Sequence, residues 1–139
     1  MSDDRKLPET DEQWLERLGP ARFQVLRKKG TERAFSGELY HHHAEGTYLC
    51  AGCEYPLFQS QDKYDSGSGW PSFSRPLSVG AVAEQRDDSH GMIRSEVLCA
   101  HCGGHLGHVF DDGPAPSGTR YCINSLALTF RDRDDDNAG

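Results

Sequence analysis

The chain contains 139 residues, enough for one domain with a single modest core, and we take residues 1–139 as that domain. Its 15 Lys and Arg residues against 22 Asp and Glu residues give a formal net charge of −7, which disfavours binding to nucleic-acid phosphates. The N-terminus lacks the basic start and apolar run of a signal peptide, and no segment approaches the roughly 20 apolar residues of a membrane-spanning helix. The composition therefore predicts a soluble cytoplasmic protein with neither a nucleic-acid nor a membrane partner.

Residues 1–30 carry the helical signals of the chain. Thr10 is a typical N-cap, and Gly19 with Pro20 predicts a stop, after which another turn or two of helix follows. Basic residues fill the last turn before Gly30, which we expect to be the C′ residue that closes this segment. The apolar residues expected on one face of the first helix are Trp14, Leu15 and Leu18.

The pattern changes beyond Gly30. Short apolar runs such as "GTYLC", "GMIRSEVLC" and "RYCINSLALTF" are separated by Gly, Pro, Asp and Ser, a spacing typical of antiparallel strands joined by loops. Residues 31–130 are therefore predicted to form a β-rich core, and residues 131–139 an acidic, flexible tail. The predicted fold class is mainly β, of the α+β type, with small sheets preceded by a helical segment.

Two C-x-x-C motifs, "CAGC" and "CAHC", stand out from the rest of the chain. They contain Cys50 and Cys53, and Cys99 and Cys102, and they lie far enough apart to belong to different hairpins. A tight turn can present two thiolates to one ion, so the pair of motifs predicts a structural zinc site with four cysteine ligands. Two disulfides or two redox dithiols are alternatives, disfavoured by the missing signal sequence and by the lack of a thioredoxin-like βαβ pattern.

A fifth cysteine, Cys122, is left over in the segment "GTRYCINS". A lone cysteine is often a buried small apolar residue. Here Arg120 and Asn124 lie two residues to either side, on the same face of an extended segment, where a cation would favour the thiolate and an amide could donate a hydrogen bond. Cys122 is therefore a candidate nucleophile.

Two histidines in "HLGHVFDDGP" form the next candidate pair. His105 and His108 are three residues apart and flanked by apolar residues, which predicts that at least one imidazole faces a partly buried pocket. A buried ring needs a polar partner, and Asp111 or the chain near Cys122 could supply it. Purely structural histidines beside a zinc turn are the alternative.

Together, the segments "CAGC", "KYDSGSGWPSF", "HGMIRSEVLCAHCGGHLGHVFDDGP" and "GTRYCINSLALTF" resemble the methionine-R-sulfoxide reductases, the MsrB family. The resemblance runs from about Thr31 to Phe130. It implies a β-rich fold of two small antiparallel sheets, a structural zinc ion held by both C-x-x-C motifs, and a catalytic cysteine at Cys122. The reaction implied is reduction of the R epimer of methionine sulfoxide in peptides and proteins, a repair of oxidative damage.

The resemblance also implies roles for the residues around Cys122. Attack by the Cys122 thiolate would yield methionine and a sulfenic acid. His105, His108 and Asn124 would hydrogen-bond the sulfoxide oxygen or adjacent water, with His108 favoured as the proton donor. The residues expected to bind the substrate are Trp70, Phe110 and Arg120, the two aromatic rings forming an apolar wall for the S-methyl group. Core packing is the alternative for the two rings.

Ser68 is the point where this chain departs from many of the proteins it resembles. They carry there a resolving cysteine that attacks the sulfenic acid to form an intramolecular disulfide, which a hydroxyl cannot do. With four cysteines assigned to zinc, we expect a one-cysteine cycle in which an external thiol, from thioredoxin or from glutathione and glutaredoxin, reduces Cys122 directly.

Two other functions are compatible with parts of the sequence. A zinc-ribbon module that binds protein or nucleic acid would leave Cys122 inert. A chaperone-like domain could bind peptides through Trp70 and Phe110, and it would then bind methionine and its sulfoxide alike without turnover.

Overall fold

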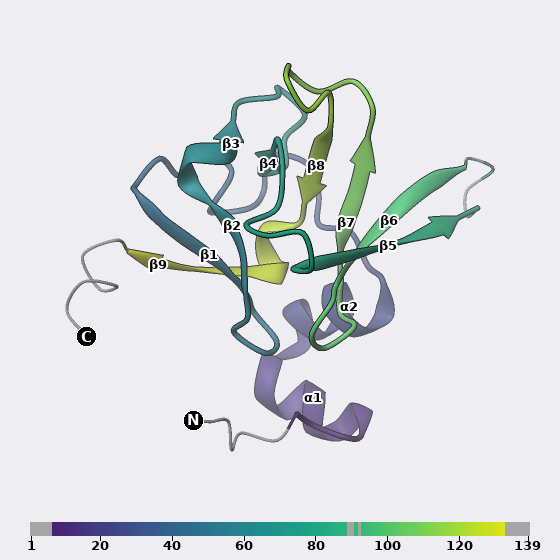
Figure 1. Cartoon of the computed structure of the whole chain (residues 1–139). Coiled ribbons are helices and arrows are strands. Elements are labelled where there is room, and N and C mark those ends of the chain that lie inside the picture. Colours follow the sequence, from purple (N-terminus) through teal and green to yellow (C-terminus); the bar gives the residue numbers. More distant parts are fainter. Residues whose placement is uncertain (1–6, 89–90, 92, 133–139) are drawn as a thin grey trace.

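A computed structural model describes residues 7–88, 91 and 93–132 of the chain. Two helices are followed by strands that form a three-stranded sheet of order β2-β1-β9 and a six-stranded sheet of order β3-β4-β8-β7-β6-β5 (Figure 1). The strand pairs are antiparallel, so the predicted mainly β fold with two antiparallel sheets and an N-terminal helical segment is confirmed. The elements are α1 (Asp11–Leu18), α2 (Pro20–Lys28), β1 (Gly46–Cys50), β2 (Pro56–Gln59), η1 (Ser60–Asp62), β3 (Lys63–Tyr64), β4 (Ser72–Phe73), β5 (Val82–Asp87), β6 (Arg94–Cys99), β7 (His105–Phe110), β8 (Arg120–Ile123), η3 (Ser125–Ala127) and β9 (Leu128–Asp132).

Helix α1 begins at the predicted cap. The Thr10 side chain accepts a hydrogen bond from the Gln13 backbone N–H, and the Gln13 side-chain oxygen accepts one from the Thr10 backbone N–H. Gly19 ends this helix, and Pro20 opens α2 at a position where its missing N–H costs nothing. The predicted apolar face was wrong at Leu15. Trp14 lies on the buried face of the helix, and the next residue, Leu15, points away from that face and is 42% exposed.

The end of α2 also differs from the prediction. The left-handed turn falls on Lys29, with φ of 60°, and Gly30 follows it outside that region. Lysine adopts this conformation less readily than glycine, and the turn is closed locally by a hydrogen bond of 2.8 Å from the Gly30 N–H to the Gln24 carbonyl oxygen. The Lys29 ammonium nitrogen lies 3.1 Å from a carboxylate oxygen of Glu96 on β6.

In the six-stranded sheet, the register of the strands places polar residues on one face and apolar residues on the other. Directly opposed residues share a face of a sheet. One face carries a row that crosses five strands and consists of Ser72, Cys122, His108, Glu96 and Gln85. The opposite face carries core residues, among them Phe73, Tyr121, Val97 and Ile123.

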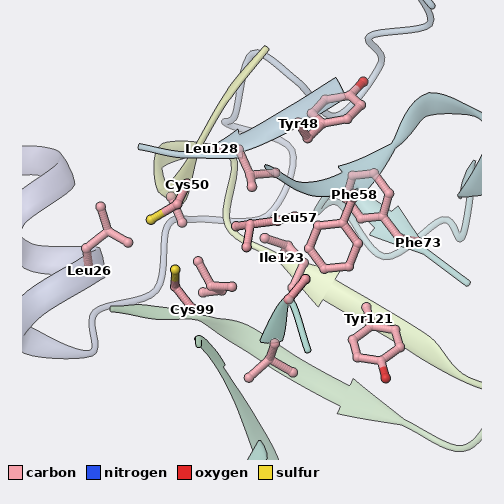
Figure 2. Packing of buried hydrophobic residues seen from close by; sticks show 14 of the residues in the cluster. Leu26, Tyr48, Cys50, Leu57, Phe58, Phe73, Cys99, Tyr121, Ile123 and Leu128 are labelled. Atoms are coloured by element: carbon pink, nitrogen blue, oxygen red, sulfur yellow. The ribbon is translucent and has the colours of Figure 1, made fainter. Parts of the chain in front are cut away.

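The core lies between the two sheets and the helices. Tyr48 from β1 and Phe58 from β2 pack against Phe73 from β4, and the rings of Phe58 and Phe73 stack 4.3 Å apart (Figure 2). These three side chains are fully buried, and rings of this size supply much of the apolar area that holds two small sheets together.

Both helices lie at one end of the sheets, where the β1–β2 and β6–β7 turns point toward them (Figure 1). Within the described residues, neither helix has the length and apolar character needed to cross a bilayer. Strand β9 includes residues 131 and 132, and the rest of the predicted acidic tail lies outside the described residues. The division into one domain with these segments stays a prediction.

Candidate active site and metal centre

The β1–β2 and β6–β7 turns bring the four cysteines of the C-x-x-C motifs together. All four sulfurs lie within 4.8 Å of one another; the Cys50 and Cys102 sulfurs are 3.7 Å apart, and those of Cys53 and Cys99 are 3.6 Å apart. A tetrahedral ion with Zn–S bonds of about 2.3 Å would place its ligands about 3.8 Å apart, whereas a disulfide bond is about 2.05 Å long. The four cysteines are free thiols with the geometry and donor type of a metal site.

The helices cover this metal centre. Figure 2 shows the Cys50 and Cys99 sulfurs close together beside Leu26 of α2. Arg27 donates to the Cys102 carbonyl oxygen at 3.1 Å and lies over the Trp14 ring at 4.4 Å. Apolar cover limits access by water, and a nearby cation suits a cluster of thiolates.

A pocket of about 240 Å³ opens on the polar face of the six-stranded sheet. We call it the Cys122 pocket, and its lining residues are Thr31, Trp70, Arg94, Gly107, His108, Phe110, Arg120, Cys122 and Asn124. It thus brings together every predicted site residue outside the metal centre except His105. A larger cavity of about 370 Å³ beside Arg22 and Phe130 has no nucleophilic cysteine, so we place the chemistry in the smaller pocket.

Cys122, on β8, receives two polar contacts at its sulfur. Arg120 Nη1 lies 3.5 Å from it and the Ser68 hydroxyl 3.4 Å from it. Asp112 orients Arg120 through two hydrogen bonds of 2.9 and 3.2 Å, which raise the pKa of the guanidinium, and the same guanidinium lies 4.4 Å above the Phe110 ring. The Arg120 guanidinium is therefore positioned to stabilise negative charge on the Cys122 sulfur.

His108 lies directly across from Cys122 on the neighbouring strand β7. Its Nε2 is 2.8 Å from a carboxylate oxygen of Asp87, and Arg94 contacts the same oxygen at 3.5 Å. The partners considered from the sequence were Asp111 and the chain near Cys122; Asp87 is the partner instead, because the pairing of β5 with β6 places Asp87 on the polar face. This carboxylate fixes the ring orientation of His108.

His105 lies behind the pocket and is only 2% exposed. Its Nδ1 is 2.7 Å from a Glu96 carboxylate oxygen, and its ring centroid is 5.5 Å from that of His108. Residues three apart on a regular strand face opposite sides, but the register shift beside Val97 places Leu106 in the core as an extra residue and leaves both histidines on one face. Burial lowers the pKa of His105 in spite of Glu96.

Asn124 lines the pocket, yet its side chain is engaged with backbone. Its amide oxygen accepts from the Glu32 N–H at 2.9 Å, and its amide nitrogen donates to the Leu106 carbonyl at 2.9 Å. One amide N–H is left for any further partner. Asn124 therefore links the segment around Glu32 to strand β7.

Trp70 and Phe110 are half-buried in the pocket wall and stand apart from the cluster of buried core residues. The indole N–H of Trp70 donates to the Glu32 carbonyl oxygen at 2.9 Å, which fixes the ring. The core-packing alternative therefore does not describe the position of these rings.

Three acidic residues that orient this site were not predicted from the sequence, namely Glu32, Asp87 and Glu96. Glu32 is buried and its carboxylate accepts from the backbone N–H groups of Ser125 and Leu126. Glu96 and Asp87 hold the two histidines. Glu96 gave the one usable signal, a carboxylate inside the apolar run "SEVL".

Comparison with known proteins shows the family of this chain. A SelR domain matches residues 18–132. Among proteins named peptide methionine sulfoxide reductase MsrB, one from Thiobacillus denitrificans is 56% identical over 127 residues, covering 91% of this chain and 96% of that protein. Others from Bradyrhizobium diazoefficiens and Leptospira interrogans are 61% and 57% identical, over 90% and 88% of this chain and 90% and 93% of their own lengths. The resemblance found in the sequence is thereby confirmed, and the chain belongs to the MsrB family of SelR-domain proteins.

Proposed function

We propose that the protein reduces the R epimer of methionine sulfoxide in peptides and proteins, as a repair of oxidative damage. The observation that carries this proposal is the Cys122 sulfur in a pocket with an imidazole, a guanidinium and two aromatic rings. The names of the relatives supply the substrate class.

The first step is attack by the Cys122 thiolate on the sulfoxide sulfur. Oxygen passes to Cys122, which becomes a sulfenic acid, while the sulfoxide is reduced to methionine and one proton is taken up. Arg120, at 3.5 Å, stabilises the thiolate before attack. His108 supplies the proton as an imidazolium: its Nε2–H is donated to Asp87, so the proton on Nδ1 is the one left for the substrate oxygen.

Trp70 and Phe110 account for recognition of one epimer. The S-methyl group packs on the two rings, an S–aromatic contact of about 0.3–1.5 kcal/mol, while the oxygen faces His108 and the free amide N–H of Asn124. Exchanging the positions of oxygen and lone pair in the S epimer would turn the oxygen away from these donors.

The metal centre would hold one zinc ion through Cys50, Cys53, Cys99 and Cys102. Four thiolate ligands leave no open coordination position, so the ion would supply a structural cross-link between two hairpins. Cys99 ends β6, the strand that carries Glu96, and the cross-link thereby supports the polar face of the sheet.

Recycling of Cys122 would depend on an external thiol. The Ser68 hydroxyl occupies the place 3.4 Å from the Cys122 sulfur from which a resolving cysteine would attack. A thiol of thioredoxin, or of glutathione with glutaredoxin, would displace water from the sulfenic acid to form a mixed disulfide, which a second thiol reduces. A cytoplasmic location, where such thiols are abundant, stays a prediction.

One assay tests this function against the two alternatives. The R and S epimers of dabsyl-methionine sulfoxide are incubated with dithiothreitol and either wild-type protein or Cys122→Ser. We expect loss of the R epimer alone, abolished by the substitution. Binding of methionine and its sulfoxide without turnover would indicate a chaperone-like domain, and a binding function that survives Cys122→Ser would indicate a zinc-ribbon module.

A further inference from the structure

Glu96 is a buried carboxylate with two partners of different kinds. It is 1% exposed; one oxygen lies 2.7 Å from His105 Nδ1 and the other 3.1 Å from the ammonium of Lys29. A buried carboxylate is costly unless its charge and lone pairs are satisfied, and here both oxygens are. The connection joins the end of helix α2 to the polar face of the sheet.

Lys29 reaches Glu96 from a backbone conformation that lysine rarely adopts. Its φ of 60° lies in the left-handed region, while the next residue, Gly30, does not use the freedom that glycine offers there. Non-glycine residues persist in such conformations where surrounding contacts fix them, and such positions cluster at functional sites. The contacts here are the hydrogen bond of 2.8 Å from the Gly30 N–H to the Gln24 carbonyl oxygen and the ion pair with Glu96.

The contact with Glu96 also determines which nitrogen of His105 carries a proton. A carboxylate can only accept, so Nδ1 donates, and a neutral ring then carries a lone pair on Nε2. That Nε2 is buried and has no partner among the described residues, and the ring stands beside His108. Because buried polar atoms normally have a partner, the unpartnered His105 Nε2 beside the Cys122 pocket is a candidate hydrogen-bond acceptor during the reaction.

We propose that Lys29 and Glu96 are positioning residues for the reduction step: Lys29 orients the Glu96 carboxylate, and Glu96 holds His105 with its proton on Nδ1 and its Nε2 as an acceptor. This inference rests on the proposed function. It divides the two histidines: His105 is neutral and accepts at Nε2, whereas His108 carries a proton on each nitrogen, one paired with Asp87 and the other donated to the sulfoxide oxygen. The C-terminal end of α2, where Lys29 is the cap residue, then also helps to position the catalytic groups.

The protonated nitrogen of His105 can be read directly by 15N NMR of the zinc-loaded full chain at neutral pH, without substrate. We expect wild-type His105 to be protonated on Nδ1 and bare on Nε2, and Glu96→Gln to lose this preference. A wild-type ring protonated on Nε2 overturns the proposal. Because the measurement needs no turnover, it holds even if the assay with the R epimer fails.

Single-turnover rates with the R epimer provide the second readout. Glu96→Gln should lower the rate on the order of 10²-fold, the cost of a misoriented group. Lys29→Met should lower it about fivefold, as expected for a half-exposed ion pair, and Lys29→Arg should restore most of that loss. Lys28→Met is the matched control, since Lys28 pairs with Asp11 at the surface, and it should change the rate less than about twofold.

Lys29→Gly separates positioning from simple stability. Glycine accepts the left-handed backbone without strain, so this variant should keep or raise the melting temperature while its rate falls as in Lys29→Met. Wild-type rates in Lys29→Met and Lys29→Gly, or equal losses in Lys28→Met and Lys29→Met, would overturn the role of Lys29. If Glu96→Gln does not fold, the Lys29 variants still test the proposal, because the Lys29 side chain is half-exposed and its replacement disturbs the core less.

Discussion

At the helical end of the molecule, four cysteines meet from two hairpin turns, whereas the Cys122 pocket is lined by different residue types from three strands of one sheet, β6, β7 and β8, and from segments outside the strands. The first site depends on spacing within short motifs, and two turns suffice to build it. The second depends on the register of neighbouring strands, on a β-bulge and on buried carboxylates that hold its imidazoles. Loss of one ligand should therefore damage the whole fold at the metal centre, while changes at the pocket should affect the reaction alone.

Removal of the metal should have the largest effect. Without the ion, four clustered thiols no longer fasten the β1–β2 turn to the β6–β7 turn, so we expect the melting temperature to fall by about 10 °C or more and activity to be lost with the fold. Differential scanning calorimetry with metal analysis measures this. Cys122→Ser is the contrasting variant, inactive with a melting temperature near wild type. Full activity and unchanged melting in verified metal-free protein would show that the centre has no structural role.

The same contrast explains what could be read from the sequence. The ligands of the metal centre follow from two local motifs, and the α1 cap follows from Thr10 and its neighbours, because these signals act over a few residues. Lys29 takes the left-handed position expected for Gly30, and its side chain forms an ion pair with Glu96, a residue 67 positions further along the chain. A single sequence holds no record of such a pairing.

His108 in the pocket and His105 behind it show most clearly which contacts a single sequence does not reveal. The pair was found from its apolar surroundings, but a spacing of three on a strand gives no reason to expect both rings on one face; the bulge at Leu106 does that. Their partners Asp87 and Glu96 come from neighbouring strands, and register alone brings them there. The residue types of the site were thus predictable, and the contacts that orient them were not.

Asp87→Asn should have an intermediate effect, confined to the reaction. An amide can turn its N–H toward His108 Nε2, so the ring loses a fixed orientation, and we expect the single-turnover rate to fall on the order of 10²-fold with the chain still folded. Glu84→Gln is the matched control, because Glu84 lies on the same strand β5 but on the opposite face. Equal losses in the two variants would mean that β5 supports the sheet in general and does not orient His108.

Ser68 should show the smallest effect on reduction and a decisive one on recycling. Its hydroxyl contacts the Cys122 sulfur at 3.4 Å beside the stronger Arg120 charge, so Ser68→Ala should change the single-turnover rate by no more than about threefold. Ser68→Cys places a thiol where the hydroxyl stands. Mass spectrometry after one turnover without reductant should then find a disulfide between residues 68 and 122, where the wild type shows a sulfenic acid.

A disulfide between Cys122 and a cysteine of the metal centre in the wild type would contradict the one-cysteine cycle. The structure argues against it, because the four sulfurs of that centre lie within 4.8 Å of one another and are engaged in a shared site, while Cys122 contacts Ser68 and Arg120 on the polar face of the sheet. The Ser68→Cys variant supplies the positive control for detecting such a bond. The two regions are then chemically separate, one retaining its thiolates for an ion and the other turning over a single sulfur.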